Sequence, residues 1–161
     1  MQRSIIRIVD IEPIITRDDN DLEIGLLNCY LENGDNFILY NVPPEITRAI
    51  AKLRSEDTYF EYRSDNRETI FELLIMLSPR LRSIGRHLGT VIIDGFDEKT
   101  MTYRASLFLE VDGVRIKKTM IPSHAIFLAL LFNKPIYVTD DVVRISKELE
   151  EEDEDYFEVD E

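Results

Sequence analysis

Cysteine is almost absent from this chain, which contains only Cys29 among its 161 residues. One cysteine cannot form an internal disulfide or a cysteine-based zinc site, and this usage is typical of a reducing compartment. Two histidines are also too few for a typical structural zinc site. Because Cys29 lies within an apolar strand pattern, we expect it to be a small core residue of a cytoplasmic protein.

Long hydrophobic runs are missing as well. No apolar run approaches the roughly 20 residues that a membrane-spanning helix needs. Residues 1–15 lack the layout of a signal peptide, and their β-branched side chains predict a first strand instead. We therefore expect a protein that does not associate with membranes.

Three loops that often mark an enzyme class are absent. The sequence contains neither the Gly-x-x-x-x-Gly-Lys-Ser/Thr loop that cradles nucleotide phosphates nor the Gly-x-Gly-x-x-Gly turn of dinucleotide-binding folds. It also lacks the Gly-x-Ser-x-Gly elbow of serine hydrolases. Nucleotide hydrolysis, dinucleotide binding and this form of serine catalysis thus lack their usual signatures.

The chain has no excess of basic residues. It contains 19 basic and 32 acidic residues, a net charge of −13, and ten of the acids lie in segment 148–161, which has no base. A nucleic-acid-binding domain usually carries a basic footprint, so any such footprint here must be local. We expect a domain over residues 1–146 and a mobile acidic tail over 147–161. The tail is either solvated or docks on a basic surface, of a protein partner or of its own region 80–87.

The apolar pattern predicts a single α/β (α+β) domain, with a mixed, mostly antiparallel sheet and two to three packed helices. The hairpin signals Asn33-Gly34 and Asp112-Gly113 join strand patterns. The expected strands are 4–15, 22–31, 36–41, 91–96, 101–111, 114–120 and 135–138, and the expected helices are 44–54, 68–77, 123–132 and one from 140. Residues 55–67 are expected to form a loop. Segment 123–132 is apolar nearly all round, so either a second helix or a second copy of the chain must cover it.

Residues 91–143 carry a resemblance. A strand with tyrosine and alanine leads into a helix that starts with proline and serine, and a short proline-isoleucine-hydrophobic-valine strand follows. This order resembles the bifunctional nuclease family, small α/β domains credited with DNase and RNase activity. The matching positions are Tyr103, Ala105, Pro122, Ser123, Ala125, Ile126, Pro135, Ile136 and Val138. Ile121 and His124 stand where the family has arginine and aspartate.

The resemblance covers roughly residues 5–145 and is specific over 91–143. It implies a homodimer with nuclease activity on DNA or RNA and little sequence preference. An alternative hypothesis is a non-catalytic dimeric module that keeps the scaffold and binds a protein or a small anionic ligand. A structural assembly factor is a third class that the sequence leaves open.

The first candidate site lies at the start of helix 123–132. A helix amino terminus offers free N–H groups that can hold a phosphate. Ser123 and His124 would lie there, and histidine is suited to acid–base catalysis of phosphodiester cleavage because imidazole titrates near neutral pH. The alternative is that Ser123 caps the helix and His124 fills a partly exposed first-turn position.

Two further groups of charged residues are candidates. Asp94, Asp97 and Glu98 could hold Mg²⁺ or Mn²⁺ for a metal-dependent nuclease, or could simply satisfy a tight turn. The second group could contact phosphates or could complement the end of a helix dipole. Its members are Arg80, Arg82, Arg86 and His87, with Arg115, Lys117 and Lys118 as additions from a neighbouring strand.

Overall fold

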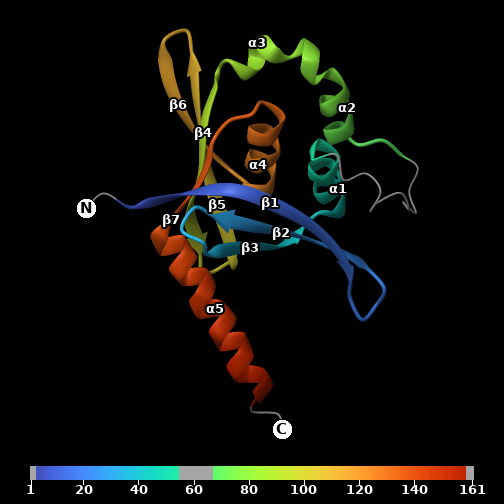
Figure 1. The fold of residues 1–161 in the computed structure, drawn as a ribbon, viewed down its shortest axis with the longest axis vertical. Coiled ribbons are helices and arrows are strands. Elements are labelled where there is room, and N and C mark those ends of the chain that lie inside the picture. Colours follow the sequence, from blue (N-terminus) through green and yellow to red (C-terminus); the bar gives the residue numbers. More distant parts are fainter. Residues whose placement is uncertain (1–2, 55–66, 159–161) are drawn as a thin grey trace.

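The computed structural model describes residues 3–54 and 67–158, with side chains as far as Asp153. They form one α/β domain around a seven-stranded sheet of order β3-β2-β1-β7-β4-β5-β6 (Figure 1). Only β4 and β7 pair in parallel, so the expectation of a mixed, mostly antiparallel sheet is confirmed. The strands are β1 (Ile5–Arg17), β2 (Glu23–Leu31), β3 (Asn36–Val42), β4 (Leu88–Asp97), β5 (Thr102–Val111), β6 (Val114–Met120) and β7 (Ile136–Thr139).

The described residues contain more helix than the two to three packed helices expected. The helices are α1 (Pro44–Leu53), α2 (Ile70–Leu77), α3 (Arg82–Gly85), α4 (Pro122–Leu131) and α5 (Asp140–Glu158), with a 3₁₀ turn at Ser78–Arg80. None of the helices in this part of the chain is long and apolar enough to cross a membrane. The predicted loop over 55–67 lies outside the described residues, except for Arg67.

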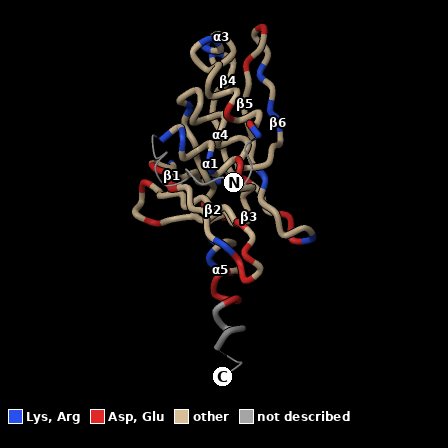
Figure 2. The backbone as a smooth tube through the Cα atoms, turned by 90° about the vertical axis from the view of Figure 1, so that its right-hand side faces the viewer, with Lys and Arg blue, Asp and Glu red and all other residues tan. Residues whose placement is uncertain are grey.

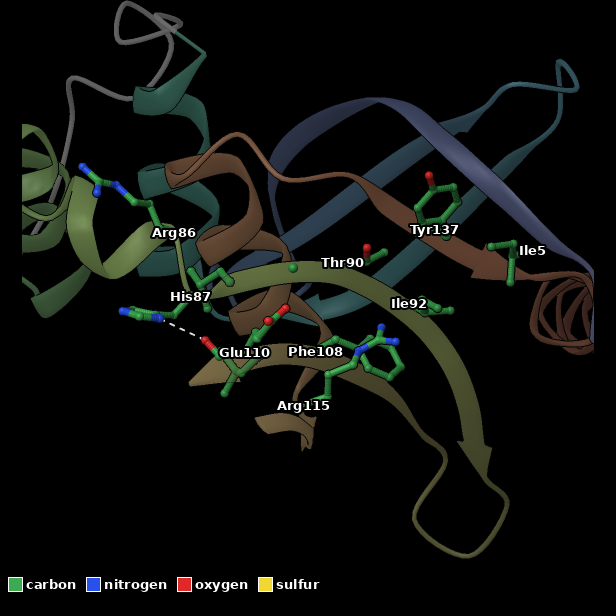
Figure 3. Close-up of a pocket in the computed structure, with 12 residues that line it drawn as sticks. Ile5, Arg86, His87, Thr90, Ile92, Phe108, Glu110, Arg115 and Tyr137 are labelled. Carbon is green, nitrogen blue, oxygen red and sulfur yellow. Dashed lines mark hydrogen bonds between the residues drawn. The ribbon is translucent and has the colours of Figure 1, made fainter. Parts of the chain in front are cut away.

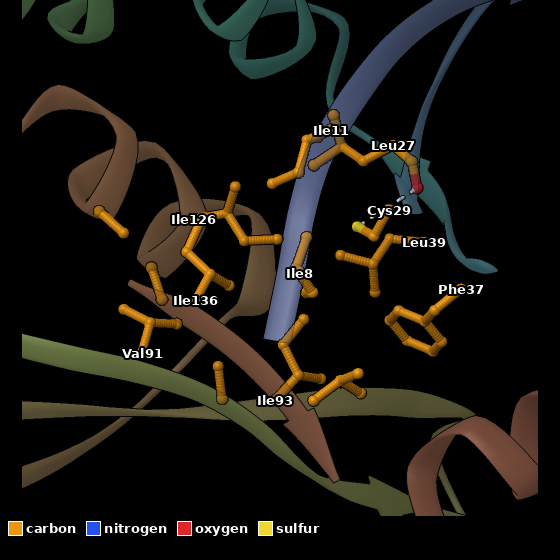
Figure 4. Close-up of a cluster of buried hydrophobic side chains, with 14 of the residues drawn as sticks. Ile8, Ile11, Leu27, Cys29, Phe37, Leu39, Val91, Ile93, Ile126 and Ile136 are labelled. Atoms are coloured by element: carbon orange, nitrogen blue, oxygen red, sulfur yellow. Dashed lines mark hydrogen bonds between the residues drawn. The ribbon is translucent and has the colours of Figure 1, made fainter. Parts of the chain in front are cut away.

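Strand β1 divides the sheet into two halves. Its first residues, Ile5 to Arg7, pair with β7, and its later residues, from Ile8 onward, pair with β2. The register shifts between Ile8 and Asp10, and such irregularities bend a strand and increase its twist. The two halves therefore share one core cluster, in which Ile8 of β1 lies between Leu27 on one side and Val91 and Ile126 on the other (Figure 4).

Cys29 belongs to this core, as expected. Its side chain is fully buried, and burial raises the pKa of the thiol to about 12. A thiol in this environment stays protonated at neutral pH and is chemically inert.

Helix α4 is covered from within the chain. It contacts α1, β4 and β5, and its Phe127 packs edge-on against Phe71 of α2 with ring centroids 5.2 Å apart. Ala125, Ile126 and Ala129 are fully buried among these elements. The sequence left open whether a second helix or a second copy of the chain covers segment 123–132. In the structure, a neighbouring helix of the same chain covers it.

Helix α5 is longer than the sequence predicts. The acidic run was expected to end the helix near residue 147, but the helix continues to Glu158 and projects away from the domain (Figure 1). Val142 and Val143 anchor its first turns in the core. Farther along, Lys147 forms an ion pair with Asp35, and the Tyr40 hydroxyl donates to the Glu150 carboxylate at 3.3 Å. These contacts with β3 and with the turn before it stabilise the acidic part of α5, which helix propensity by itself would not keep folded.

Candidate functional site

The two faces of the sheet around β4 have different surroundings. Val91 and Ile93 of β4 are fully buried on the side of α4. Because successive side chains of a strand point to opposite faces, Thr90 and Ile92 point away from α4. Ile92 pairs with Tyr137 of β7 and with Ser106 of β5. Ile92 and Tyr137 are only half-buried, so this second face is open to solvent.

A cavity of about 410 Å³ lies on this second face (Figure 3). We call it the sheet cavity. Apolar side chains from several strands line it, among them Ile92, Phe108 and Tyr137. Charged and polar side chains lie at its edge: Arg86, His87, Thr90, Glu110 and Arg115. The cavity therefore combines an apolar surface with three basic side chains that come from two separate segments.

His87 is held in a defined orientation at this edge. Its ring Nδ1 lies 2.9 Å from the carbonyl oxygen of Glu110 (Figure 3). A carbonyl oxygen only accepts hydrogen bonds, so Nδ1 carries a proton and donates it. The neutral ring then keeps a free lone pair on Nε2, which can accept a proton from a bound molecule.

Arg86 lies between the sheet cavity and a second cavity of about 340 Å³. Arg82 and Lys134 also line this second cavity, at the carboxyl end of α4. Short helix α3 can approach that end because Gly85 has no side chain: a Cβ there would lie 2.5 Å from the Phe132 ring. The absence of a side chain at Gly85 thus lets Arg82 and Arg86 lie close to the carboxyl end of α4.

The predicted basic group is only partly brought together. Arg86, His87 and Arg115 all line the sheet cavity, although the Arg86 side chain points away from Phe108 and Tyr137 (Figure 3), and Arg82 lines the second cavity. Arg80 is exposed and lines neither. Lys117 pairs with Phe108 on β5, next to the sheet cavity, whereas Lys118 pairs with the buried Leu107.

The predicted catalytic pair, Ser123 and His124, lies at the start of α4 and not at the sheet cavity. Ser123 is only 4% exposed. The half-buried His124 ring packs edge-on against Phe71, with centroids 5.7 Å apart. Neither residue lines either of the two cavities. The residue before the helix is Ile121, whose side chain makes no capping bond, so Ser123 is not the helix cap. The geometry agrees with a first-turn packing position for His124, and its catalytic role stays a prediction.

The predicted metal ligands make local hydrogen bonds. Asp94 accepts a bond from the Ser106 hydroxyl at 2.7 Å. Asp97 accepts one from the backbone N–H of Lys99 at 2.9 Å, as acidic turn residues often do. Glu98 is exposed. Within residues 3–54 and 67–158, no three histidine, cysteine or acidic residues are grouped so as to hold a metal ion. Binding of Mg²⁺ or Mn²⁺ at Asp94, Asp97 and Glu98 stays a prediction.

Basic and acidic residues are distributed unevenly over the molecule. Basic residues occur at α3 and along β6, and acidic residues lie along the described part of α5 (Figure 2). Helix α5 leads away from α3 (Figure 1). The backbone of α5 therefore leads away from region 80–87 as far as Glu158, and docking of the tail on a basic surface stays a prediction.

Sequence reasoning missed the aromatic lining of the sheet cavity. The strand pattern over 101–111 already places Phe108 on the face that carries Thr102, Arg104, Ser106 and Glu110. A large aromatic residue on a polar face is the signal that could have identified it. Comparison with known proteins adds no name to the site, because no family model and no curated protein matches the chain.

Proposed function

We propose that this protein binds a nucleic acid in the sheet cavity and cleaves its phosphodiester bonds with little sequence preference. The observation that carries the proposal is the oriented ring of His87 at the edge of a cavity that Arg86 and Arg115 also line. The guanidinium groups provide charge and hydrogen-bond donors for phosphate oxygens. The free Nε2 of His87 provides a proton acceptor in the same cavity.

The cleavage step needs one proton acceptor and one proton donor. Nε2 of His87 removes the proton from the attacking oxygen, which is a water or a ribose hydroxyl. A bond from that oxygen to phosphorus forms, and the bond from phosphorus to the leaving oxygen breaks. The imidazolium then returns the proton to the leaving oxygen. Arg86 and Arg115 stabilise the negative charge that develops on the phosphoryl oxygens.

In a metal-dependent form of this proposal, Asp94, Asp97 and Glu98 would hold Mg²⁺ or Mn²⁺; they are not grouped as metal ligands in the structure, so the ion would have to draw them together. Asp94 lies on β4, two residues beyond Ile92, so its side chain is on the strand that forms the middle of the sheet cavity. A divalent ion there would neutralise phosphate charge and lower the pKa of a bound water.

The second candidate is a non-catalytic binding module. Burial of Ser123 and packing of His124 on Phe71 favour it, because the helix start that resembles the nuclease signature then has a structural role. In this case, the sheet cavity binds its ligand and releases it unchanged.

Cleavage assays separate the two candidates. Labelled single- and double-stranded DNA and RNA are incubated with protein in Mg²⁺, in Mn²⁺ and in chelator. We expect His87→Ala to lower the cleavage rate by about 10²-fold or more. The matched variant His124→Ala should retain it, and Asp97→Ala/Glu98→Ala reports on the metal. Binding without cleavage by the wild type supports the non-catalytic module. If the wild type neither binds nor cleaves any substrate, both candidate functions are contradicted. If only His124→Ala loses cleavage, the catalytic site lies at the start of α4 and not in the sheet cavity.

We also propose that the protein is a homodimer, as the family resemblance implies. Helix α2 has no fully buried residue, although its sequence is strongly apolar. A surface of exposed apolar side chains results, which we call the α2 surface: Ile70, Leu73, Met76, Leu77 and the nearby Ile84. Exposed apolar side chains gathered on one helix often mark a protein interface, and a second copy of the chain is the partner we propose for them.

A further inference from the structure

We infer that the sheet cavity takes a single-stranded nucleic acid, with bases stacked on Phe108 and Tyr137 and phosphates held by Arg86 and Arg115. The inference rests on the binding part of the proposed function and deepens it by naming the form of the substrate. It does not depend on whether the strand is cleaved.

The positions of the two rings follow from strand register. Tyr137 of β7 pairs with Ile92 of β4, and Phe108 of β5 pairs with Lys117 of β6. Strand β4 lies between β7 and β5. Neighbouring strands are about 4.8 Å apart, and Phe108 lies two residues along β5 from Ser106, the partner of Ile92, so roughly 12 Å separates the backbones that carry the rings. Both rings line one cavity and are half-buried, which leaves ring surface available to a ligand.

Aromatic rings on an open sheet suit bases better than most other ligands. Every base has a flat π face, so stacking on phenylalanine or tyrosine tolerates any sequence. Sheet-based modules that bind single strands use this arrangement, with aromatic residues on central strands and basic residues around them. The low sequence preference proposed for this protein agrees with such contacts.

The charges around the rings complement a phosphate backbone. Within the described part of the chain, neither Arg86 nor Arg115 forms an ion pair. The exposed Arg86 side chain points away from the rings in Figure 3 and would turn toward a bound strand. Lys117 adds a third cation beside Phe108. Of the nearby acids, Asp94 already accepts a bond from Ser106. Glu110 is the acid that remains at the cavity edge.

A duplex does not suit this cavity. In a duplex, the bases are stacked on each other and their faces cannot reach side-chain rings. A single strand exposes those faces, and its bases can turn toward the sheet while the backbone follows the basic side chains. The aromatic lining of the cavity thus favours unpaired strands.

Binding to labelled oligonucleotides, measured by fluorescence anisotropy with chelator present, tests the inference. The probes are single-stranded RNA and DNA, the matching duplexes, and a sugar-phosphate strand without bases. Phe108→Leu and Tyr137→Leu remove the ring faces but keep apolar volume. Each should weaken single-strand binding about tenfold. Tyr40→Leu, at an exposed tyrosine of β3, is the matched control and should bind like the wild type.

The outcomes separate this inference from the proposed function. Arg115→Gln should weaken binding to strands with and without bases equally and reduce the salt dependence. Equal affinity for duplex and single strand, or for the base-free strand, overturns the stacking inference alone. Wild-type affinity in both leucine variants also overturns it, provided that their thermal unfolding shows a native fold. Failure to bind any of the probes overturns the proposed function itself.

Discussion

His87 and Glu110 are hydrogen-bonded to each other twice. The backbone N–H of Glu110 donates to the carbonyl oxygen of His87 at 2.8 Å, and Nδ1 of the His87 ring donates to the carbonyl oxygen of Glu110 at 2.9 Å. This pair extends the β4–β5 ladder one residue beyond the Leu88–Leu109 pair. A residue that follows α3 in the sequence is thereby fastened to β5 at the edge of the sheet cavity.

We predict that His87→Ala changes function far more than stability. The side chain is exposed, and the backbone bond to Glu110 survives the substitution, so the free energy of unfolding should fall by less than about 1 kcal/mol. His124→Ala removes a ring that packs on Phe71 and should cost more, about 1–2 kcal/mol. Urea denaturation of both variants measures the difference. A larger loss in His87→Ala than in His124→Ala would show that His87 has mainly a structural role.

Gly25 of β2 should not tolerate a side chain. It is buried, and a Cβ at this position would overlap both the Thr47 hydroxyl and the carbonyl oxygen of Val42. Gly25→Ala should therefore destabilise the fold by about 1–3 kcal/mol. Adding Thr47→Ala relieves only the first overlap, because the second involves the backbone, so the double variant should recover part of the loss. Thermal unfolding of the single and double variants, with Thr47→Ala alone as baseline, measures this. A Gly25→Ala protein as stable as the wild type contradicts it.

The ion pair between Asp10 and Arg54 should contribute to stability in a pH-dependent way. Arg54 lies just after α1 and donates to Asp10 of β1 at 2.6 Å. This hydrogen bond is the main cause that lowers the pKa of Asp10 below its ordinary 3.8. A lowered pKa means that the contribution is complete above about pH 4 and is lost as the pH falls through the folded-state value.

Asp10→Asn should accordingly lower the free energy of unfolding at pH 7 by about 0.5–1 kcal/mol, as expected for a partly exposed pair. The difference from the wild type should shrink in strongly acidic solution. Denaturation at pH 7 and near pH 3 provides the measurement. An equal difference at both values would mean that the carboxylate charge is not what stabilises the contact.

The α2 surface should govern self-association. Met76 is 70% exposed and Leu73 is 48% exposed. Met76→Glu or Leu73→Glu would place a charge in the proposed apolar interface, so we expect a dimer for the wild type and a monomer for these variants. Val9→Glu, at a residue of β1 that is 59% exposed, is the control and should remain dimeric. Analytical ultracentrifugation at micromolar concentration distinguishes the states, and a monomeric wild type would contradict the proposal.

Removal of the last residues of α5 should affect nucleic-acid binding only at long range. Truncation after Asp153 deletes five acids but keeps the Tyr40–Glu150 contact. Because α5 projects away from α3, we expect association that is at most a few-fold faster at low salt, with no difference at high salt. Stopped-flow binding at two salt concentrations measures the effect. A large gain in affinity that persists at high salt would instead indicate direct docking of the acidic segment, as on a basic partner.

Local patterns predicted most of the secondary structure. The alternation in residues 101–111 corresponds to β5, and Asp112 and Gly113 both adopt the positive φ that their hairpin signal requires. The acidic end of α5 was missed, because the contacts of Lys147 and Glu150 with Asp35 and Tyr40 join residues more than 100 positions apart. No local propensity reports such contacts.

The candidate site was predicted less well than the fold. Basic residues 80–87 and Arg115 could be suspected from charge alone, but which of them line the sheet cavity depends on the pairing of β4, β5 and β7. Ser123 and His124 looked suitable by residue type, yet Phe71 packs against His124 and the surroundings of Ser123 bury it. Residue chemistry shows what a side chain can do, whereas burial decides whether a ligand can reach it.

The amino-acid sequence by itself determined the alternation of the strands, the turns between them and the need to bury segment 123–132, because these follow from side-chain size and backbone preference over a few residues. Only the tertiary structure decided which side of the sheet α4 covers and which side stays open to solvent. That choice depends on the pairing of β1 with β7, two strands that are far apart in the sequence and adjacent in the middle of the sheet. It leaves Phe108, Tyr137 and His87 on the open side, where a ligand can reach them.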